Sequence, residues 1–504
     1  MKSTGGERVF KDALVRGTGK CFTMLATESA RRKYRPLVLW ACGQRLGYDT
    51  QVEGTRALFL YDLIGRYPSP EPFLDVVEKK VFAVVRRFFS PANKSVLESL
   101  FMQECDLLTM FAEGGNLRAR RILADCYERF SRRLLNLASP SKPDMLVLDS
   151  FDNLCGALLS CSGSMEAQPL LERIVKDIGV LCMRNGACDS SLADYFRCLA
   201  ENRLGEKRYA AMIGRIGPIS EVEAYKAAVF QAKKESETWY AKRRRRQNLG
   251  YEEVYRQVAE HGTVGIRYMV KRWRLDGRTK DIAGLAKFYV SEKNLETRAG
   301  LLDLFSYYET KCEGYLPLDC VLRDAASDDD SLRVSALGVL RSVKDPRVHD
   351  FALEMLKKRG VSHELLSVLA GNYRPDDDDF LIGAMKKIGS MRHRVHSILA
   401  RIPEEKNGDR LSRRMLMHLY DTIECTCCRE RVVRELGRRR LLTDDMLAEC
   451  LHDASDNIRD YAKRLLSRRR ANAGIQDGLE SCFKRLEMAA ARSVAAPKKK
   501  GSKA

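Results

Sequence analysis

The sequence predicts an all-α protein whose second half is an α-solenoid, a superhelix of stacked antiparallel helix pairs. Three observations predict this fold class. Apolar residues recur at spacings of three and four along almost the whole chain, which is the periodicity of an amphipathic helix. Only 14 prolines interrupt the 504 residues, so long helical runs are permitted. A motif also recurs in the second half at the period of two-helix repeats, whose units pack on their neighbours.

The first part of the chain has the pattern of helical hairpins. Residues 37–46 are predicted to form one helix. Thr50 is predicted to begin the next, with Glu53 completing a capping box. Similar pairs continue to about residue 230, and Gly-, Pro- and Ser-rich turn signals separate them. These signals lie at 68–72, 139–144, 184–191 and 214–220. We therefore expect an N-terminal domain of helical hairpins over residues 1–230.

A composition change marks the predicted domain boundary. Residues 231–248 are nearly all polar and carry seven basic residues against two acidic ones. We predict a basic linker or exposed helix at 231–249, although a charged face within a continuous solenoid has the same pattern. The repeat domain is then expected at 250–480. Residues 481–504 end in a run of lysines after Pro497 and are predicted to be a disordered basic tail.

An internal repeat supports the solenoid. The segments 330–340 and 456–466 both follow the pattern Asp-x-aliphatic-Arg-x-x-Ala-x-x-aliphatic-Leu. Weaker copies at 297–304 and 412–419 place an arginine at the same position. The separations between these arginines fall near one or two units of roughly 40 residues. The four arginines are Arg298, Arg333, Arg413 and Arg459. Asp330 and Asp456 are predicted to be N-caps, because a short oxygen acceptor satisfies an amide of the first helical turn.

The segment 320–356 resembles a HEAT-like repeat. An apolar helix ends in an acidic turn, the next helix opens with Leu-Arg-x-x-Ala-Leu, and Asp345-Pro346 begins the following one. The resemblance is clearest at 320–356 and 451–466, and it implies a HEAT-like or armadillo-type superhelix. In that family, an aspartate of the turn and an arginine of the second helix hydrogen-bond between stacked units. The resemblance therefore implies a structural role for Asp330 with Arg333, and for Asp456 with Arg459.

The chain carries a formal charge of +20, from 88 Lys+Arg against 68 Asp+Glu. Such a charge attracts polyanions or acidic protein surfaces, although a solvated helical surface explains it equally. At 267–280, six basic residues accompany Tyr268 and Trp273, a combination that can neutralise phosphates and stack on bases. An amphipathic helix with these rings in the core is the alternative. The predicted binding residues are Arg267, Lys271, Arg272, Trp273, Arg274, Arg438, Arg439 and Arg440.

Three further patterns suggest ligand sites, and each has a structural alternative. Gly17-Thr18-Gly19-Lys20 lacks the first glycine and the Ser/Thr of a phosphate loop, because Leu14 and Cys21 occupy those positions. Asp376–Asp379 directly precedes an apolar helix, where carboxylates favour the positive helix end. A cysteine-rich cluster could supply zinc ligands, but packing thiols explain it as well. This cluster contains His418, Cys425, Cys427, Cys428, Cys450 and His452. We predict no metal and no cofactor.

The expected compartment is the cytoplasm. The first residues contain no apolar core of a signal peptide, and the sequence has no run of 18 apolar residues. The 16 cysteines are scattered, which is typical of buried, reduced thiols.

The predicted function is that of a non-catalytic scaffold with an extended basic surface. A protein partner is favoured, because helical-repeat grooves suit peptides and helices, and a nucleic acid is the alternative partner. HEAT-like relatives include scaffolds, transport receptors, phycobilin lyases and DNA glycosylases, so the resemblance specifies architecture better than function. The alternative is an enzyme resembling the HEAT-like alkylpurine DNA glycosylases. It rests on Trp239, Trp273 and Asp276, which stand in basic surroundings.

Overall fold

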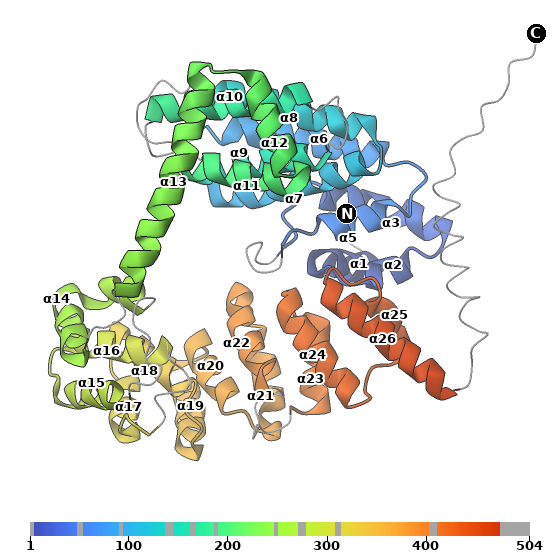
Figure 1. Cartoon of the computed structure of the whole chain (residues 1–504). Coiled ribbons are helices and arrows are strands. Elements are labelled where there is room, and N and C mark those ends of the chain that lie inside the picture. Colours follow the sequence, from blue (N-terminus) through green and yellow to red (C-terminus); the bar gives the residue numbers. More distant parts are fainter. Residues whose placement is uncertain are drawn as a thin grey trace, which may run out of the picture. The chain divides into compact units, whose positions relative to one another are not determined.

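The computed structural model of the chain describes a set of helices separated by short connections (Figure 1). Within the described residues every regular element is a helix, so the chain is all-α, as the periodicity predicts. None of these helices is long and apolar enough to cross a membrane. The described residues are 5–47, 54–89, 94–136, 145–161, 168–185, 190–245, 250–270, 279–307, 314–402 and 411–473.

The chain divides into two compact units. Unit 1 contains Met1–Ser236, Glu424–Glu430 and Arg440–Ala504, and unit 2 contains Glu237–Ile423 and Arg431–Arg439. The C-terminal helices therefore belong to the same unit as the N-terminal ones, whereas the sequence analysis grouped residues 250–480 together. Two helices, α13 (Ser220–Arg245) and α24 (Thr426–Arg438), extend across a boundary between the units.

Unit 1 is built from helices that range from the 5 residues of α2 to the 26 residues of α13. Its elements are α1 (Gly5–Arg16), α2 (Lys20–Met24), α3 (Glu28–Ala41), α5 (Ala57–Ile64), α6 (Glu71–Arg87), α7 (Lys94–Glu113), α8 (Leu117–Leu135), α9 (Met145–Cys161), α10 (Gln168–Asn185), α11 (Ser190–Leu204), α12 (Glu206–Ile216), α13 (Ser220–Arg245), α25 (Asp444–Cys450) and α26 (Asp456–Ala473).

The helices of unit 1 pack in two successions. One consists of α5, α7, α9 and α11, the other of α6, α8, α10 and α12, and neighbouring members of the two also pair. Aromatic rings fill the core between them: the centroid of Phe130 lies 5.7 Å from that of Phe88 and 5.8 Å from that of Phe101. One buried carboxylate is satisfied across helices, since Tyr127 and Ser131 each donate to Asp177 at 2.6 Å. Such bonds offset the desolvation of the buried carboxylate.

Unit 2 follows the same plan with shorter helices. Its elements are α14 (Tyr251–Val270), α15 (Thr279–Ser291), α16 (Leu295–Tyr307), α17 (Leu318–Ala325), α18 (Asp330–Leu340), α19 (Pro346–Arg359), α20 (His363–Gly371), the 3₁₀ turn η3 (Pro375–Asp377), α21 (Asp378–Met385), the 3₁₀ turn η4 (Gly389–Met391), α22 (Arg392–Leu399), α23 (Arg413–Thr422) and α24 (Thr426–Arg438). In this unit α14, α16, α18, α20 and α22 pack in succession, and α15, α17 and α19 pair with their neighbours.

Local sequence explains where many helices begin. Thr27, Ser362 and Ser412 cap α3, α20 and α23, because each side-chain oxygen accepts from an amide of the first turn. Asp345 caps α19 and Pro346 follows it, as the sequence predicts. The helix predicted at 37–46 instead spans Glu28–Ala41 and contains Pro36. Its N-cap, Thr27, therefore lies ten residues before the predicted start.

Candidate functional site

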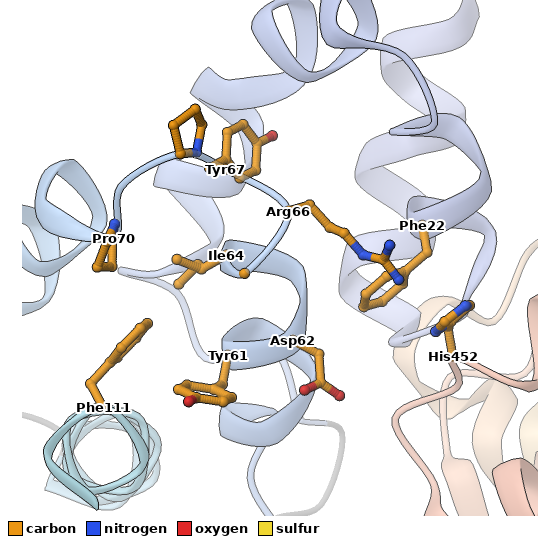
Figure 2. Close-up of a pocket in the computed structure, with 11 residues that line it drawn as sticks. Phe22, Tyr61, Asp62, Ile64, Arg66, Tyr67, Pro70, Phe111 and His452 are labelled. Atoms are coloured by element: carbon orange, nitrogen blue, oxygen red, sulfur yellow. The ribbon is translucent and has the colours of Figure 1, made fainter. Parts of the chain in front are cut away.

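Unit 1 contains a pocket of about 600 Å³, within the range of small-ligand and peptide side-chain sites. Helices α2, α5 and α7, the α5–α6 connection and the residues after α25 form its walls (Figure 2). The lining residues are Phe22, Tyr61, Asp62, Ile64, Gly65, Arg66, Tyr67, Pro68, Pro70, Phe111 and His452.

Helix α5 and the loop after it supply most of the wall. Leu60, Leu63 and Ile64 are buried in the core, so the helical period turns Tyr61 and Asp62 toward the pocket. The helix ends at Ile64 with Gly65 as its C-cap. The connection then carries Arg66 to Pro70 around the pocket before α6 begins.

Aromatic rings give the pocket an apolar wall that is already packed. Phe22 is 8% exposed. Its ring is stacked on His452, with centroids 4.7 Å apart, and the guanidinium carbon of Arg66 lies 5.3 Å from its centroid. Tyr61 meets Phe111 edge-on at 4.9 Å. The faces of Phe22 are therefore engaged by protein side chains.

Two charged groups stand in the pocket. Neither Asp62 nor Arg66 forms an ion pair with any residue that the structure describes. Desolvation by the surrounding protein raises the pKa of the Asp62 carboxyl group, and the positive charges of Arg459 and Arg66 oppose this shift. Burial also lowers the pKa of Arg66, against the opposing charge of Asp62. Each group would gain from a ligand of opposite charge, since an opposite charge favours the ionised form.

Further positive charge lies beside this wall. Tyr67 is buried, and its hydroxyl has no hydrogen-bond partner among the described residues. Burial raises the pKa of Tyr67, and the charges of Arg35 and Arg31 oppose that shift. Arg31 also contributes to lowering the pKa of Arg66. The Arg66 side of the pocket is therefore electropositive.

The imidazole of His452 is neutral at pH 7. Burial and the charges of Arg66 and Arg459 lower its pKa to about 4. Its ring therefore contributes to the pocket as an aromatic surface. In the sequence His452 is a candidate zinc ligand only, and nothing in its local pattern indicates an aromatic contact with α2.

The predicted binding residues fall into two groups. Lys271, Arg272, Trp273 and Arg274 lie outside the described residues, and Arg267 lies in α14 but its side chain is not described. Trp239, Trp273 and Asp276, which carried the glycosylase alternative, likewise lie outside the described side chains.

The arginines at the end of α24 are described. Arg438 and Arg439 both pair with Glu435. Burial alone would raise the pKa of Glu435. The two guanidinium groups lower it by more than burial raises it, so the net shift of the pKa is downward. Arg440 is exposed to solvent, and its backbone φ angle is 58°. Local pairing therefore reduces the charge that 438–440 can offer a partner, and a binding role for these residues stays a prediction.

The predicted repeat residues are ion-paired, but within single helices. Arg333 pairs with Asp330 and donates to the carbonyl oxygen of Ser327 at 3.0 Å. Arg459 pairs with Asp456 and donates to that of Asp453 at 2.7 Å. The two arginines therefore have the same local geometry, six residues after the carbonyl that they bind.

The prediction that Asp330 is an N-cap is wrong. Asp329 caps α18 by accepting from the amide of Leu332 at 2.8 Å, and Asp330 is the first helical residue. Asp456 is likewise the first residue of α26, and Ser455 accepts from the amide of Ile458 at 3.5 Å. Asp329 and Asp330 are adjacent acceptors, and so are Ser455 and Asp456. Sequence alone does not show which member of each pair caps the helix.

Other pairs connect helices in the way that the resemblance implied for Arg333 and Arg459. Arg298 donates to Asp324 at 2.6 Å, and Tyr289 donates to the same carboxylate at 2.6 Å. Arg429 forms two bonds of 2.9 Å with Asp453. All four charged side chains are buried. Removing one partner of such a buried ion pair destabilises the fold, because the remaining charge stays buried without a counter-charge.

The glycine-rich segment near the N-terminus has a packing role. The carbonyl oxygen of Gly17 accepts from the amide of Ala454 at 2.8 Å. A Cβ atom on Gly19 would lie 1.8 Å from the carbonyl oxygen of Glu449. These glycines therefore permit a close backbone contact with the residues around α25. Cys425, Cys428 and Cys450 are buried, and the absence of a metal stays a prediction.

No family model matches the chain, and no curated protein matches it. One matching solved structure is that of an engineered protein, a crystal structure from the Northeast Structural Genomics Consortium. It is 12% identical, and the match covers 91% of this chain and 98% of that one with a TM-score of 0.18. At this score and identity the likeness carries no inference about fold or function.

Proposed function

We propose that the chain is a non-catalytic helical-repeat protein that binds an acidic segment of a partner protein in the pocket of unit 1. The observation that carries the proposal is Arg66. Its guanidinium group stands in an apolar pocket without an ion-pair partner among the described residues. A carboxylate on a partner would supply that missing charge, and a charge-assisted hydrogen bond is stronger than a neutral one.

The architecture that we propose is a HEAT-like α-solenoid. Two facts support it: alternate helices pack in succession in each unit, and the segment that resembles a HEAT-like repeat coincides with α17, α18 and α19. Proteins built in this way expose long surfaces to extended partners. The basic surface and cytoplasmic location predicted from the sequence belong to the same proposal.

A peptide suits this pocket better than a nucleic acid does. Single strands bind by stacking bases on open aromatic faces, whereas Phe22 is covered by His452 and Arg66. A peptide side chain can instead occupy the apolar wall while a neighbouring carboxylate meets Arg66.

The test uses a fluorescein-labelled peptide in which one tyrosine is flanked by glutamates. We expect the full chain to bind it, and Arg66→Gln to weaken binding by roughly tenfold or more, because a hydrogen bond to a charged group contributes about 1.5–3 kcal/mol. Arg208→Gln is the matched control, since Arg208 is exposed on α12, outside the pocket. It should bind as the wild type does.

Labelled single-stranded and duplex DNA distinguish the alternative partner. Each neutralised phosphate of a duplex adds about 0.9 to the slope of log affinity against log salt. Tight DNA binding with a steep slope, together with no binding of the glutamate-flanked peptide, would overturn the proposal. Equal binding of a peptide with lysines in place of the glutamates would overturn the role of Arg66.

A further inference from the structure

The pocket lies where residues from near the two ends of the chain meet. Phe22 and the α5 residues come from the first 70 residues, whereas His452 follows α25. Helices α2 and α25 are in contact, and a backbone hydrogen bond of 2.8 Å joins Ala454 to Gly17. One wall of the pocket therefore depends on a contact between segments more than 400 residues apart in sequence.

Two glycines make this contact close. Gly17 has φ +66°, and a Cβ atom there would lie 2.7 Å from that of Ala454. At Gly19 a Cβ atom would lie 1.8 Å from the carbonyl oxygen of Glu449. An L side chain rarely adopts the first conformation, and the second distance is a clash with backbone. Either substitution therefore has to push α2 and α25 apart.

A buried ion pair fixes the segment that presents His452. Arg429 is 1% exposed and Asp453 is 3% exposed. Besides its two bonds to Asp453, Arg429 donates to the carbonyl oxygen of Gly17 at 3.4 Å. Asp453 in turn accepts from the amide of Ser455 at 2.9 Å. Asp453, the residue next to His452, is thus bonded to Arg429 of α24, and Arg429 in turn is bonded to the connection that precedes α2.

We propose that the pocket is a composite site that exists only while α25 and α26 are docked against α1 and α2, so that binding of the partner peptide locks the two chain ends together. This inference rests on the proposed function, because it concerns the same site. A ligand that touches Arg66 and His452 at once binds the docked state better than the undocked one. Linkage then requires that docking strengthens binding and that binding strengthens docking by the same factor.

Hydrogen exchange of the full chain tests the second half of that statement without any substitution. With the glutamate-flanked tyrosine peptide present at 100 times its dissociation constant, the docked state gains a factor of about 100 over the undocked state. Exchange in α25 and at residues 449–459 should slow accordingly, and exchange in α16 and α18 of unit 2 should not change. Unchanged exchange at 449–459 under a bound peptide would overturn the coupling.

Gly19→Ala tests the first half. It should speed exchange at 449–459 and weaken binding of the same peptide by roughly tenfold, as expected for an overpacked contact. Gly214→Ala is the matched control, because a Cβ atom there meets no neighbouring atom within 4 Å. It should leave both measurements unchanged.

The outcomes separate the two proposals. A wild-type chain that does not bind the peptide refutes the proposed function, and the coupling with it. A wild-type chain that binds, and a Gly19→Ala variant that exchanges faster at 449–459 yet binds equally well, refutes the coupling alone. If Gly19→Ala fails to fold, the exchange experiment on the wild type still decides the question.

Discussion

Replacing Glu104 by glutamine should remove a loss of stability that this residue causes as the pH rises. Glu104 lies on α7 with no exposed surface. Neither carboxyl oxygen has a hydrogen-bond partner among the described residues. Burial raises the pKa of Glu104 well above its ordinary value of 4.5, and the charge of Lys80 opposes the shift only in part. The side chain is therefore protonated in the folded protein at a pH where it is ionised in the unfolded chain.

The sign of the effect follows from proton binding. Above pH 4.5 and below the folded-state pKa, the folded state holds one proton more than the unfolded state. The free energy of unfolding then decreases as pH rises, by about 1.4 kcal/mol per pH unit. The contribution of Glu104 to stability is complete below pH 4.5 and is lost as pH rises toward the folded-state pKa.

The assay is urea unfolding followed by circular dichroism at pH 5, 6, 7 and 8. Glutamine has nearly the same shape and does not ionise, so Glu104→Gln should gain stability relative to the wild type by about 1.4 kcal/mol for each pH unit between 4.5 and the folded-state pKa of Glu104. Glu113→Gln is the control, because Glu113 is exposed at the end of the same helix. Parallel pH profiles for Glu104→Gln and the wild type would refute the argument that the buried carboxyl group holds a proton.

Three further predictions concern stability. Arg298→Ala should lower the free energy of unfolding by about 3–5 kcal/mol, because it leaves the buried Asp324 without its cation. Arg333→Ala should lower it by less than about 1 kcal/mol, because the partner of Arg333 is exposed. A larger loss of thermal stability for Arg333→Ala than for Arg298→Ala would contradict this. The pKa of His452 is lowered from 6.5 to about 4, so the unfolded chain binds more protons between these values and stability falls as pH falls. His452→Phe keeps an aromatic ring and should flatten that acid limb in urea unfolding; an unchanged limb would rule this role out. Gly371→Ala should cost about 1–3 kcal/mol, because a Cβ atom would lie 2.1 Å from a backbone oxygen, while Gly383→Ala, which meets nothing within 4 Å, should not destabilise; equal unfolding midpoints would refute the clash.

The sequence by itself determined the helical class and the start of α19. Both depend on neighbours in the chain: apolar spacing defines a buried face, and Asp345-Pro346 supplies a cap and a fixed φ within two residues. The repeat motif also predicted that Arg333 and Arg459 occupy equivalent places, and their matching bonds to the carbonyl six residues earlier agree with that equivalence. The sequence did not predict the N-cap of α18 correctly. Asp329 and Asp330 are adjacent and both offer a carboxylate acceptor, and the structure shows that Asp329 is the cap.

Only the tertiary structure decided which distant segments meet. Helical periodicity states that a face is buried but not against what, so nothing local indicated that α25 packs on α2 or that His452 stacks on Phe22. Nor did the sequence indicate the role of Gly17 and Gly19: it argued against a phosphate loop there, but only the structure shows their close backbone contact with the residues around α25. The pairing of arginines with aspartates likewise depends on distance in space: Arg298 and Arg429 form buried pairs of the kind that the HEAT-like resemblance implied for Arg333 and Arg459.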